Sequence, residues 1–423
     1  MESAQSRYYW LVEKAAALLL LVYPTFMLAV KHGMNGVFFL MLILALAAWI
    51  VRPSGMSPVM WHREWTIYTL AMAAMTLAIL ISQTANHSNT VRFHDAATRY
   101  WLSVPVLLLL YRLRPKALTV LQLAFPVAAI TGFLLAKDFG GRSGVATLDL
   151  IRFGNFELIL GVMSLFSLNW FGRDALPLRM LKILGFIAGF FASLASGSRG
   201  GWLMIPVFIV IYIYFKVPKL SFRVILTTFL AASLVATLLY SANSTFRQRL
   251  DNFSQEVAMA KEATESNKGN LDTSFGVRLQ LYKAALDVIS RHPVFGVGPA
   301  GFALEMEPMM KAGKITPEAA GLGRGEVHND ILYKTAGMGM FGLIALLGIY
   351  FVPLRLFWRA TKSACKQAQR AGQLGVTFVS GIIVYGLTAE CLNLTMTTAF
   401  YSFTVAALLA VCYNVHYGEP LAK

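Results

Sequence analysis

The chain has 423 residues, of which 57% are hydrophobic and 14% are charged, and its formal net charge is +16 at pH 7. A soluble protein of this length cannot bury so much apolar surface, so the composition excludes an ordinary soluble domain and predicts an integral membrane protein. The positive charge by itself would suit nucleic-acid binding, but its distribution along the chain excludes that function.

The apolar stretches give the predicted elements in chain order. A membrane-spanning helix needs about 20 apolar residues. Windows of that length predict twelve spans, at residues 15–30, 35–51, 66–82, 101–111, 117–136, 155–171, 179–195, 200–215, 222–240, 330–353, 373–388 and 397–414. We therefore predict an all-α polytopic membrane protein with about 12 transmembrane helices. No cleavable signal peptide is expected, because the first run has no clear small-residue cleavage site and another span follows it at once.

Positive charge is distributed unevenly among the predicted loops. Eighteen lysines and arginines lie at the N-terminus and after the even-numbered spans, against seven in the opposite short loops. Cytoplasmic loops carry such an excess. We therefore expect both termini in the cytoplasm, and we expect the long insert after the ninth span on the outer face of the membrane.

That insert, residues 241–327, is the one long polar segment. Its ten basic and ten acidic residues balance, which argues against a polyanion-binding tail. Apolar residues at helical spacing predict an amphipathic helix near 246–260 and a second helix near 275–290, which His292-Pro293 ends. A glycine-rich turn follows. We divide the chain into transmembrane helices one to nine (1–241), an outer helical loop domain (242–328) and transmembrane helices ten to twelve (329–423).

The insert ends at His328-Asn329, directly before the tenth span. Histidine is the side chain whose ordinary pKa lets it exchange a proton near neutral pH, so His328 is the first candidate for a catalytic base. The alternative is structural, since an interfacial residue at this position would also cap the start of the span.

Four arginines on the predicted outer side form the second candidate group. Arg199 lies in the very short link between the seventh and eighth spans, Arg278 on the second helix of the insert, and Arg142 and Arg152 before the sixth span. A guanidinium this close to a membrane is costly unless it meets an anion or an aqueous cavity, and its planar fork suits phosphate oxygens. These residues are candidates to hold a phosphate or pyrophosphate; snorkelling to lipid headgroups or pairing with loop carboxylates is the alternative.

Metal-ligand motifs are missing from the sequence. It contains no His-Glu-x-x-His, no paired Cys-x-x-Cys and no Asp-x-Asp. The ligand clusters expected for Zn²⁺ or Mg²⁺ are therefore absent, and we expect neither a metal nor another cofactor.

A long motif lies in the insert. Residues Arg278–Phe302 follow the pattern Arg-x-x-x-Tyr-x-x-Ala-x-x-x-Ile-x-x-His-Pro-x-x-Gly-x-Gly-x-x-x-Phe, which resembles the large periplasmic loop of the bacterial O-antigen ligases and polymerases. The Ser198-Arg199-Gly200 link and the layout of twelve spans with one long outer loop agree with it.

A second motif resembles the lipopolysaccharide O-antigen ligases in particular. His328-Asn329 is followed after nine residues by Gly339 and after two more by Gly342, which matches their histidine-glycine motif. The chain departs from the pattern at Leu343, where the ligases usually have Gly, Thr or Tyr.

The resemblance implies a GT-C-like membrane glycosyltransferase of lipopolysaccharide biosynthesis in the bacterial inner membrane. Its donor would be O-antigen polysaccharide on undecaprenyl pyrophosphate and its acceptor lipid A–core oligosaccharide, with membrane lipid around it and no nucleic acid. His328 would be the base, Arg199 and Arg278 the pyrophosphate contacts with Arg142 and Arg152 as further candidates, and the outer loop would be periplasmic. Arginines could then replace Mg²⁺ at the leaving group, and a direct displacement would invert the anomeric carbon.

Three other functions stay open at this point. An O-antigen polymerase uses the same lipid-linked donor and differs in its acceptor, and a protein O-oligosaccharyltransferase also belongs to this class of enzyme. A secondary transporter with twelve spans is the alternative from a different class, although transporters often show two related halves and none is visible here.

Overall fold

The computed structural model describes residues 2–53, 55–216 and 271–417, together with short stretches between residues 237 and 261. Apart from one two-stranded hairpin, every element in these ranges is helical. The elements are α1 (Glu2–Ala29), α2 (Gly33–Val51), α3 (Arg63–Ala85), α4 (Arg92–Leu110), α5 (Pro115–Leu118), α6 (Leu121–Leu135), β1 (Lys137–Asp138), β2 (Ser143–Gly144), α7 (Leu150–Phe166), α8 (Leu176–Ser196), η1 (Arg199–Leu203), α9 (Met204–Lys216), α12 (Ser274–Arg291), α13 (Gly301–Lys311), α14 (Pro317–Gly323), α15 (Asp330–Ala360), α16 (Lys366–Gly386), α17 (Thr395–Cys412) and η2 (Val415–Tyr417).

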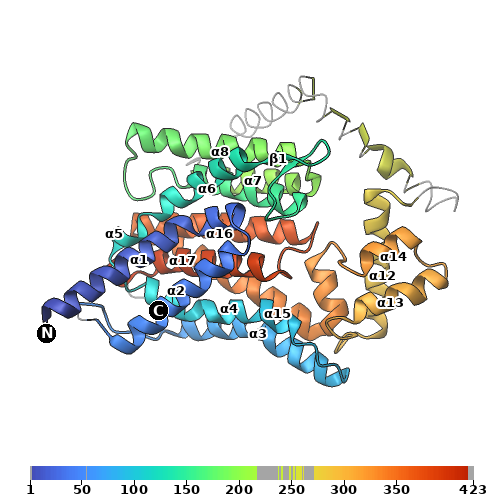
Figure 1. Ribbon diagram of the computed structural model, residues 1–423, viewed down its shortest axis with the longest axis horizontal. Coiled ribbons are helices and arrows are strands. Elements are labelled where there is room, and N and C mark those ends of the chain that lie inside the picture. The colour runs from blue at the N-terminus through green and yellow to red at the C-terminus, as the bar shows by residue number, and fades with distance from the viewer. Residues whose placement is uncertain are drawn as a thin grey trace.

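The long helices run side by side in a bundle, and α12, α13 and α14 project from one end of it (Figure 1). Helix α17 lies at the centre of the bundle, where 89% of the residues in its most apolar segment are buried. It packs against α4 and α16, while α7 packs against α8 and α15 against α3. The bundle therefore forms one apolar core, and the polar part of the chain is concentrated at one end.

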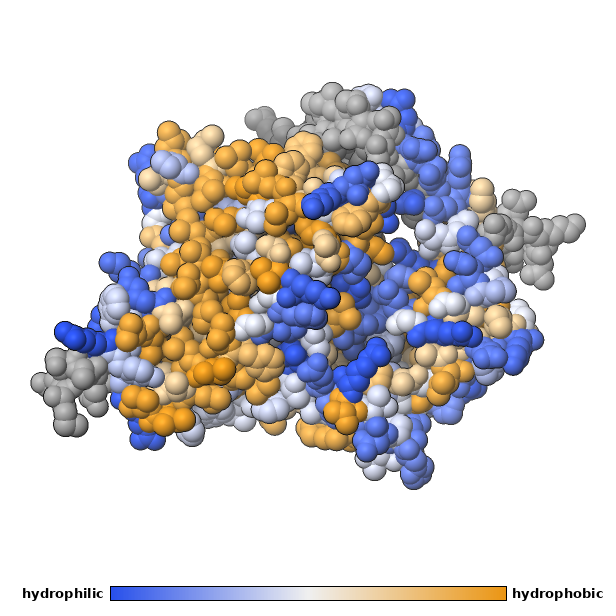
Figure 2. Space-filling view, in the orientation of Figure 1, coloured by the Kyte–Doolittle hydropathy of each residue, from blue (hydrophilic) through white to orange (hydrophobic). Residues whose placement is uncertain are grey.

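Among the described residues, eight helices are long and apolar enough to cross a membrane. They cover Arg7–Ala29, Gly33–Val51, Arg63–Ala85, Pro115–Leu135, Leu176–Ser196, Arg199–Lys216, Asp330–Ala360 and Thr395–Tyr417. The prediction of an all-α multi-pass membrane protein is confirmed. Figure 2 agrees, because apolar side chains cover the flank of the bundle and hydrophilic ones gather over the end that carries α12 to α14.

Three further predicted spans lie on α4, α7 and α16, which are shorter or more polar than the other eight. Helix α4 begins nine residues before the predicted span, and its first turns include Arg99, which is buried and paired with Asp95 at 2.8 Å. The predicted span 222–240 lies largely outside the described residues. Of the predicted helix 246–260, the structure describes residues 247, 248, 251, 252 and 254–259, and all of these are helical. The total of twelve spans and the GT-C type stay predictions.

The three helices of the insert have a small core of their own. Val327, just before α15, and Ala336, on α15, join the buried apolar residues of these helices, which are Val277, Leu281, Ala284, Ala285, Val288, Phe302, Met306, Met309, Ile315, Ala319 and Ala320. The helix predicted near 275–290 is α12, whose Thr273 caps the N-terminus and whose C-cap is His292. This core ties the insert to α15 at the end of the bundle.

Helix α15 is broken at Gly339, and the glycine-rich turn of the insert fits into the break. Gly339 has φ 60° and ψ −149°, a conformation that is essentially restricted to glycine. A Cβ atom there would overlap the carbonyl oxygen of Val294. The Met340 amide donates to the Pro293 carbonyl at 2.9 Å, and the Val297 amide donates to the Ala336 carbonyl at 3.1 Å.

Gly342, the second glycine of the motif, is required by the same break in α15. A Cβ atom on Gly342 would overlap the carbonyl oxygen of Lys334, because the kink brings these two turns of α15 together. Ser82 on α3 lies within hydrogen-bond distance of the Phe295 and Gly337 carbonyls, at 2.8 and 3.0 Å. Gly339 and Gly342 therefore shape the helix that begins directly after His328.

Candidate functional site

His328 lies in the segment between α14 and α15, with an unusual backbone conformation for a residue with a side chain. Its φ is 61°, and its side chain is only 7% exposed. The Tyr282 hydroxyl donates to the His328 carbonyl at 3.0 Å. The preceding amide, that of Val327, donates to Glu390 Oε1 at 2.5 Å. Contacts from two other elements thus hold a strained backbone in place, which is common at functional sites.

Asn329 fixes the same segment from the other side. Its side-chain oxygen accepts a hydrogen bond from the Leu332 amide at 3.1 Å, which caps the N-terminus of α15. Its side-chain nitrogen donates to the Leu387 carbonyl at 3.2 Å. Both polar atoms of the Asn329 side chain therefore form hydrogen bonds with backbone groups, and these bonds hold the backbone next to His328 in place.

A cavity of about 900 Å³ opens beside His328. Three of the four candidate arginines line it, namely Arg142 after β1, Arg152 on the first turn of α7 and Arg278 on α12. Residues widely separated in the sequence thus meet around one hollow at the end of the bundle.

A second cavity, of about 580 Å³, shares Arg142 and Arg278 with the first. The fourth arginine, Arg199, lines this cavity from η1. Apolar side chains, including Trp202 and Phe275, make up much of the remaining wall. The two cavities therefore adjoin one another, with cations along their common wall and an apolar surface in one of them.

The arginines differ in the partners that they already have. Arg152 pairs with Asp149 at 2.6 Å, and Arg142 Nε donates to the Ser196 carbonyl at 2.7 Å. Arg199 pairs with Glu256 at 3.1 Å. Burial, together with the charge of Arg199, lowers the pKa of Arg142. Positive charge is therefore crowded in the second cavity, and a bound anion would relieve it.

The arginines of the cavities also affect the pKa of His328. Burial, and then the guanidinium groups of Arg278 and Arg152, lower the pKa of His328 to about 4, while the carboxylate of Asp149 acts in the opposite direction. His328 is consequently neutral at physiological pH and able to accept a proton.

The structure brings together the predicted residues His328, Arg142, Arg152, Arg199 and Arg278 around the two adjoining cavities. The motif residues Asn329, Gly339 and Gly342 do not line the cavities and instead shape the backbone behind His328. In the part of the chain that the structure describes, no group of three or more His, Cys, Asp or Glu side chains could hold a metal ion.

Sequence reasoning assigned no role to three residues that contact this segment, although one of them, Tyr282, is the tyrosine of the motif that begins at Arg278. Tyr282 lies one helical turn after Arg278, a spacing that places both on the same face of α12. Glu326 lies two residues before His328, and its Oε2 atom is 3.8 Å from His328 Nδ1. Their proximity in the sequence was the available signal; the contact of Glu390 with Val327 depends on a distant loop and had none.

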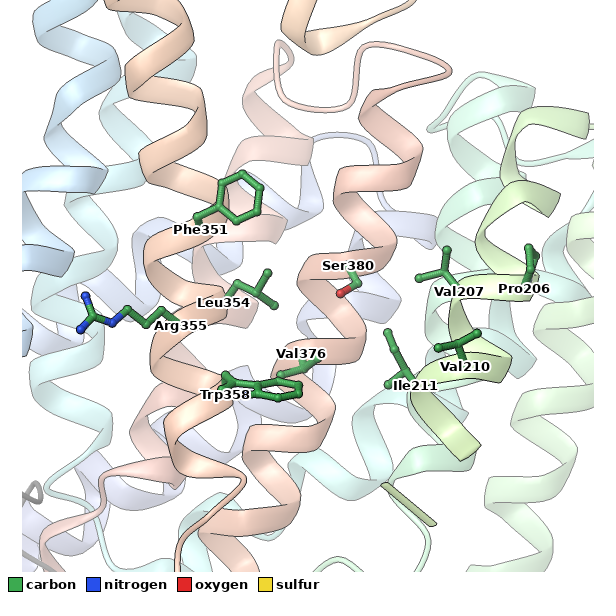
Figure 3. Close-up of a pocket in the computed structure, with 10 residues that line it drawn as sticks. All are labelled: Pro206, Val207, Val210, Ile211, Phe351, Leu354, Arg355, Trp358, Val376 and Ser380. Atoms are coloured by element: carbon green, nitrogen blue, oxygen red, sulfur yellow. The ribbon is translucent and has the colours of Figure 1, made fainter. Parts of the chain in front are cut away.

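Another cavity, of about 810 Å³, lies between α9, α15 and α16 (Figure 3). Its walls are apolar side chains such as Val207, Phe351 and Trp358, with Ser380 the one short polar group. The side chain of Arg355 extends away from the other labelled residues. This cavity offers an apolar surface between helices, and Arg355 is the one charged residue that lines it.

Comparison with known proteins places part of the candidate site inside a recognised region. Residues 184–347 match the sequence profile of the family described as O-antigen ligase. The match includes Arg199, Arg278 and His328, whereas Arg142 and Arg152 precede it. An uncharacterized protein of Haemophilus influenzae is 25% identical over 316 residues, which are 74% of this chain and 77% of that protein.

Proposed function

We propose that the chain, whose residues 184–347 match the O-antigen ligase family, transfers O-antigen polysaccharide from undecaprenyl pyrophosphate to lipid A–core oligosaccharide. The observation that carries this proposal is the meeting of one neutral histidine with four arginines around two adjoining cavities. A sugar-hydroxyl acceptor needs a base, and a pyrophosphate leaving group needs cations.

In the proposed reaction, neutral His328 accepts the proton of an acceptor sugar hydroxyl. The hydroxyl oxygen attacks the anomeric carbon of the donor and forms the new glycosidic bond. The bond between that carbon and the pyrophosphate oxygen breaks, and undecaprenyl pyrophosphate leaves with the electron pair. A single displacement of this kind inverts the anomeric configuration.

The leaving group gains negative charge in the transition state, and Arg199, Arg278 and Arg142 are placed to stabilise it. We assign no metal to this role. Arg152 already pairs with Asp149, so its contribution is the positive field that it adds at His328. The reaction is driven by the good leaving group of the glycosyl pyrophosphate donor, and no nucleotide is consumed.

We propose that the protein lies in the bacterial inner membrane with both termini in the cytoplasm and α12 to α14 in the periplasm. Both substrates are anchored in lipid, which suits a site at the end of the bundle. The apolar wall formed by Trp202 and Phe275 could admit the first isoprenoid units of the donor beside the cations.

Complementation of a strain that lacks its ligase tests the proposal, with gel analysis of lipopolysaccharide as the measurement. Polymer-capped lipid A–core in the presence of this protein is expected. Lipopolysaccharide that stays uncapped would contradict ligation. In a strain that has a ligase but no polymerase, conversion of single-unit caps to long chains would identify a polymerase instead.

The His328→Ala variant tests the base. We expect it to reach the membrane in normal amount and to give no capping, because no other group is assigned to take the proton. Normal capping by this variant would overturn the assignment of His328.

A further inference from the structure

One nitrogen of the candidate base is turned away from open space. His328 Nδ1 is buried and has no hydrogen-bond partner among the described residues. A buried polar atom without a partner costs about 1–3 kcal/mol, so this arrangement calls for an explanation. Because the ring lines the cavity of about 900 Å³, the other nitrogen, Nε2, is the one left to meet a substrate.

The group nearest to Nδ1 is a carboxylate. Glu326 Oε2 lies 3.8 Å from His328 Nδ1 and 3.7 Å from Arg152 Nη2. Within the described ranges, Glu326 is the one acidic residue within ion-pair distance of this imidazole. Its side chain is 28% exposed, and it lines the same cavity as His328.

The other nearby carboxylates are occupied elsewhere. Asp149 accepts from the backbone amides of Ile151 and Arg152 and pairs with the Arg152 guanidinium, so it serves as the N-cap of α7. Glu390 accepts from the Val327 amide and from Asn393. Glu326 differs from both because its partners are two side chains of the cavity itself.

We propose that Glu326 is the positioning residue for His328: its carboxylate accepts the Nδ1 proton, holds Nε2 toward the acceptor hydroxyl and stabilises the imidazolium that forms. This inference rests on the proposed function. The present 3.8 Å exceeds a hydrogen bond, and catalytic hydrogen bonds of ligand-free enzymes are often long and tighten when substrate binds.

The short chain between α14 and α15 allows this adjustment. The Glu326 amide donates to the Leu322 carbonyl at 3.2 Å, so its backbone is held against the end of α14. Formation of the hydrogen bond between the Glu326 carboxylate and His328 Nδ1 therefore needs a rotation of the Glu326 side chain alone. An anionic donor that engages the neighbouring arginines would weaken the hold of Arg152 on Glu326 and leave the carboxylate free to turn to the imidazole.

Steady-state transfer by the purified full chain tests the inference, with undecaprenyl-pyrophosphate-linked oligosaccharide as donor and lipid A–core as acceptor. Glu326→Gln should lower kcat about 10- to 100-fold with KM for the donor within about twofold, as expected when a base loses its orienting partner. Glu326→Asp, which keeps the carboxylate, should recover part of the loss. The acid limb of the kcat profile should move to lower pH in Glu326→Gln, because the imidazolium loses a nearby negative charge.

Glu307→Gln is the matched control, since Glu307 lies on α13, pairs with Lys311 and lines neither cavity. It should have wild-type kinetics, and equal melting temperatures for the variants would show that they fold. A kcat within twofold of wild type for Glu326→Gln, or a change in KM alone, would overturn the inference. If His328→Ala stays active, the proposed base itself is wrong; if His328→Ala is inactive and Glu326→Gln is normal, only the role of Glu326 fails.

Discussion

The hydroxyl of Tyr282 lies 3.0 Å from the carbonyl oxygen of His328 and 3.2 Å from that of Leu387. Tyr282 is on α12, one turn after Arg278, so the helix that carries an arginine of the cavities also holds the backbone of the histidine. A shift of α12 would therefore move Arg278 and His328 together. The geometry of the proposed pyrophosphate contact and that of the proposed base are linked through this one helix.

Tyr282→Phe should weaken the link while it keeps the aromatic ring in the core of the insert. A hydrogen bond of this kind contributes about 1 kcal/mol, so we expect kcat/KM for transfer to fall about fivefold. The measurement is the initial rate of transfer in detergent. Tyr214→Phe is the control, because the Tyr214 hydroxyl has no hydrogen bond to the described residues while its ring stacks on Trp358. Equal rates for the two variants would show that the Tyr282 hydroxyl does not hold the site.

The low pKa of His328 leads to a prediction about pH. A histidine with its pKa lowered to about 4 stays neutral as the pH falls through 6.5, and it loses the ability to accept a proton only near pH 4. In the profile of kcat/KM, which reports the free enzyme, the acid limb should therefore lie near pH 4. Burial, Arg278 and Arg152 lower this pKa, and Asp149 acts in the opposite direction.

The donor complex should titrate at a higher pH than the free enzyme. A bound pyrophosphate offsets the charge of Arg278, and this raises the pKa of His328 and makes it a stronger base. We expect the acid limb of kcat to lie above that of kcat/KM. Coincident limbs at about 6.5, the ordinary histidine value, would mean that the arginines do not act on the base.

Helices could be predicted from the sequence where their apolar periodicity is uninterrupted. The prediction failed where contacts with distant residues determine the backbone conformation. Helix α12 was predicted within about one residue at each end, because its apolar face and its His292-Pro293 end are local signals. The break in α15 was not predicted. Gly339 looks unremarkable in an apolar run, and its conformation depends on the Val294 carbonyl, 45 positions earlier in the chain.

In the candidate site, too, some features could be predicted from the local sequence and others depend on distant contacts. His328 and the arginines could be proposed because their chemistry is unusual at a membrane edge, and Arg142 and Arg152 were the weaker candidates. Their placement beside Arg278 depends on the packing of α7 and α8 and could not follow from spacing. Glu326 belongs to no motif. Its nearness to His328 in the sequence was the available signal, and its distance from the imidazole identifies it in the structure.

Gly339→Ala should destabilise the protein, because alanine at φ 60° and ψ −149° is strained and its Cβ would overlap the Val294 carbonyl. The strain alone costs about 1–3 kcal/mol, and the overlap adds to it. The apparent melting temperature in detergent measures the effect. Gly337→Ala is the control from the same kink, since its Cβ would lie 3.4 Å from the Gly298 carbonyl, in ordinary contact. Equal melting temperatures for the two variants would contradict the role assigned to Gly339.

Inorganic pyrophosphate should raise the melting temperature of the purified protein, because it would relieve the crowding of Arg142, Arg199 and Arg278. A ligand present at about 100 times its Kd stabilises the folded state by about 2.7 kcal/mol. Arg199→Gln and Arg278→Gln should lose most of the shift at constant ionic strength. Arg291→Gln should keep it, since Arg291 is on the same helix as Arg278 but pairs with Glu305 at 2.6 Å, outside both cavities. A full shift in Arg199→Gln would exclude this arginine from anion binding.

The ion pair between Arg199 and Glu256 predicts a competition with the same anion. The Glu256 carboxylate lies 3.1 Å from Arg199 Nη2 and lines the second cavity, so a pyrophosphate that binds Arg199 must displace it or share the guanidinium with it. Glu256→Gln removes the competing charge, and about 1 kcal/mol of lost competition would lower the Kd for pyrophosphate about fivefold. Titration calorimetry measures the change, with Glu305→Gln as the control because Glu305 pairs with Arg291 instead. If Glu256→Gln binds pyrophosphate more weakly than the wild type, the carboxylate serves to orient Arg199 for the anion, and the competition does not occur.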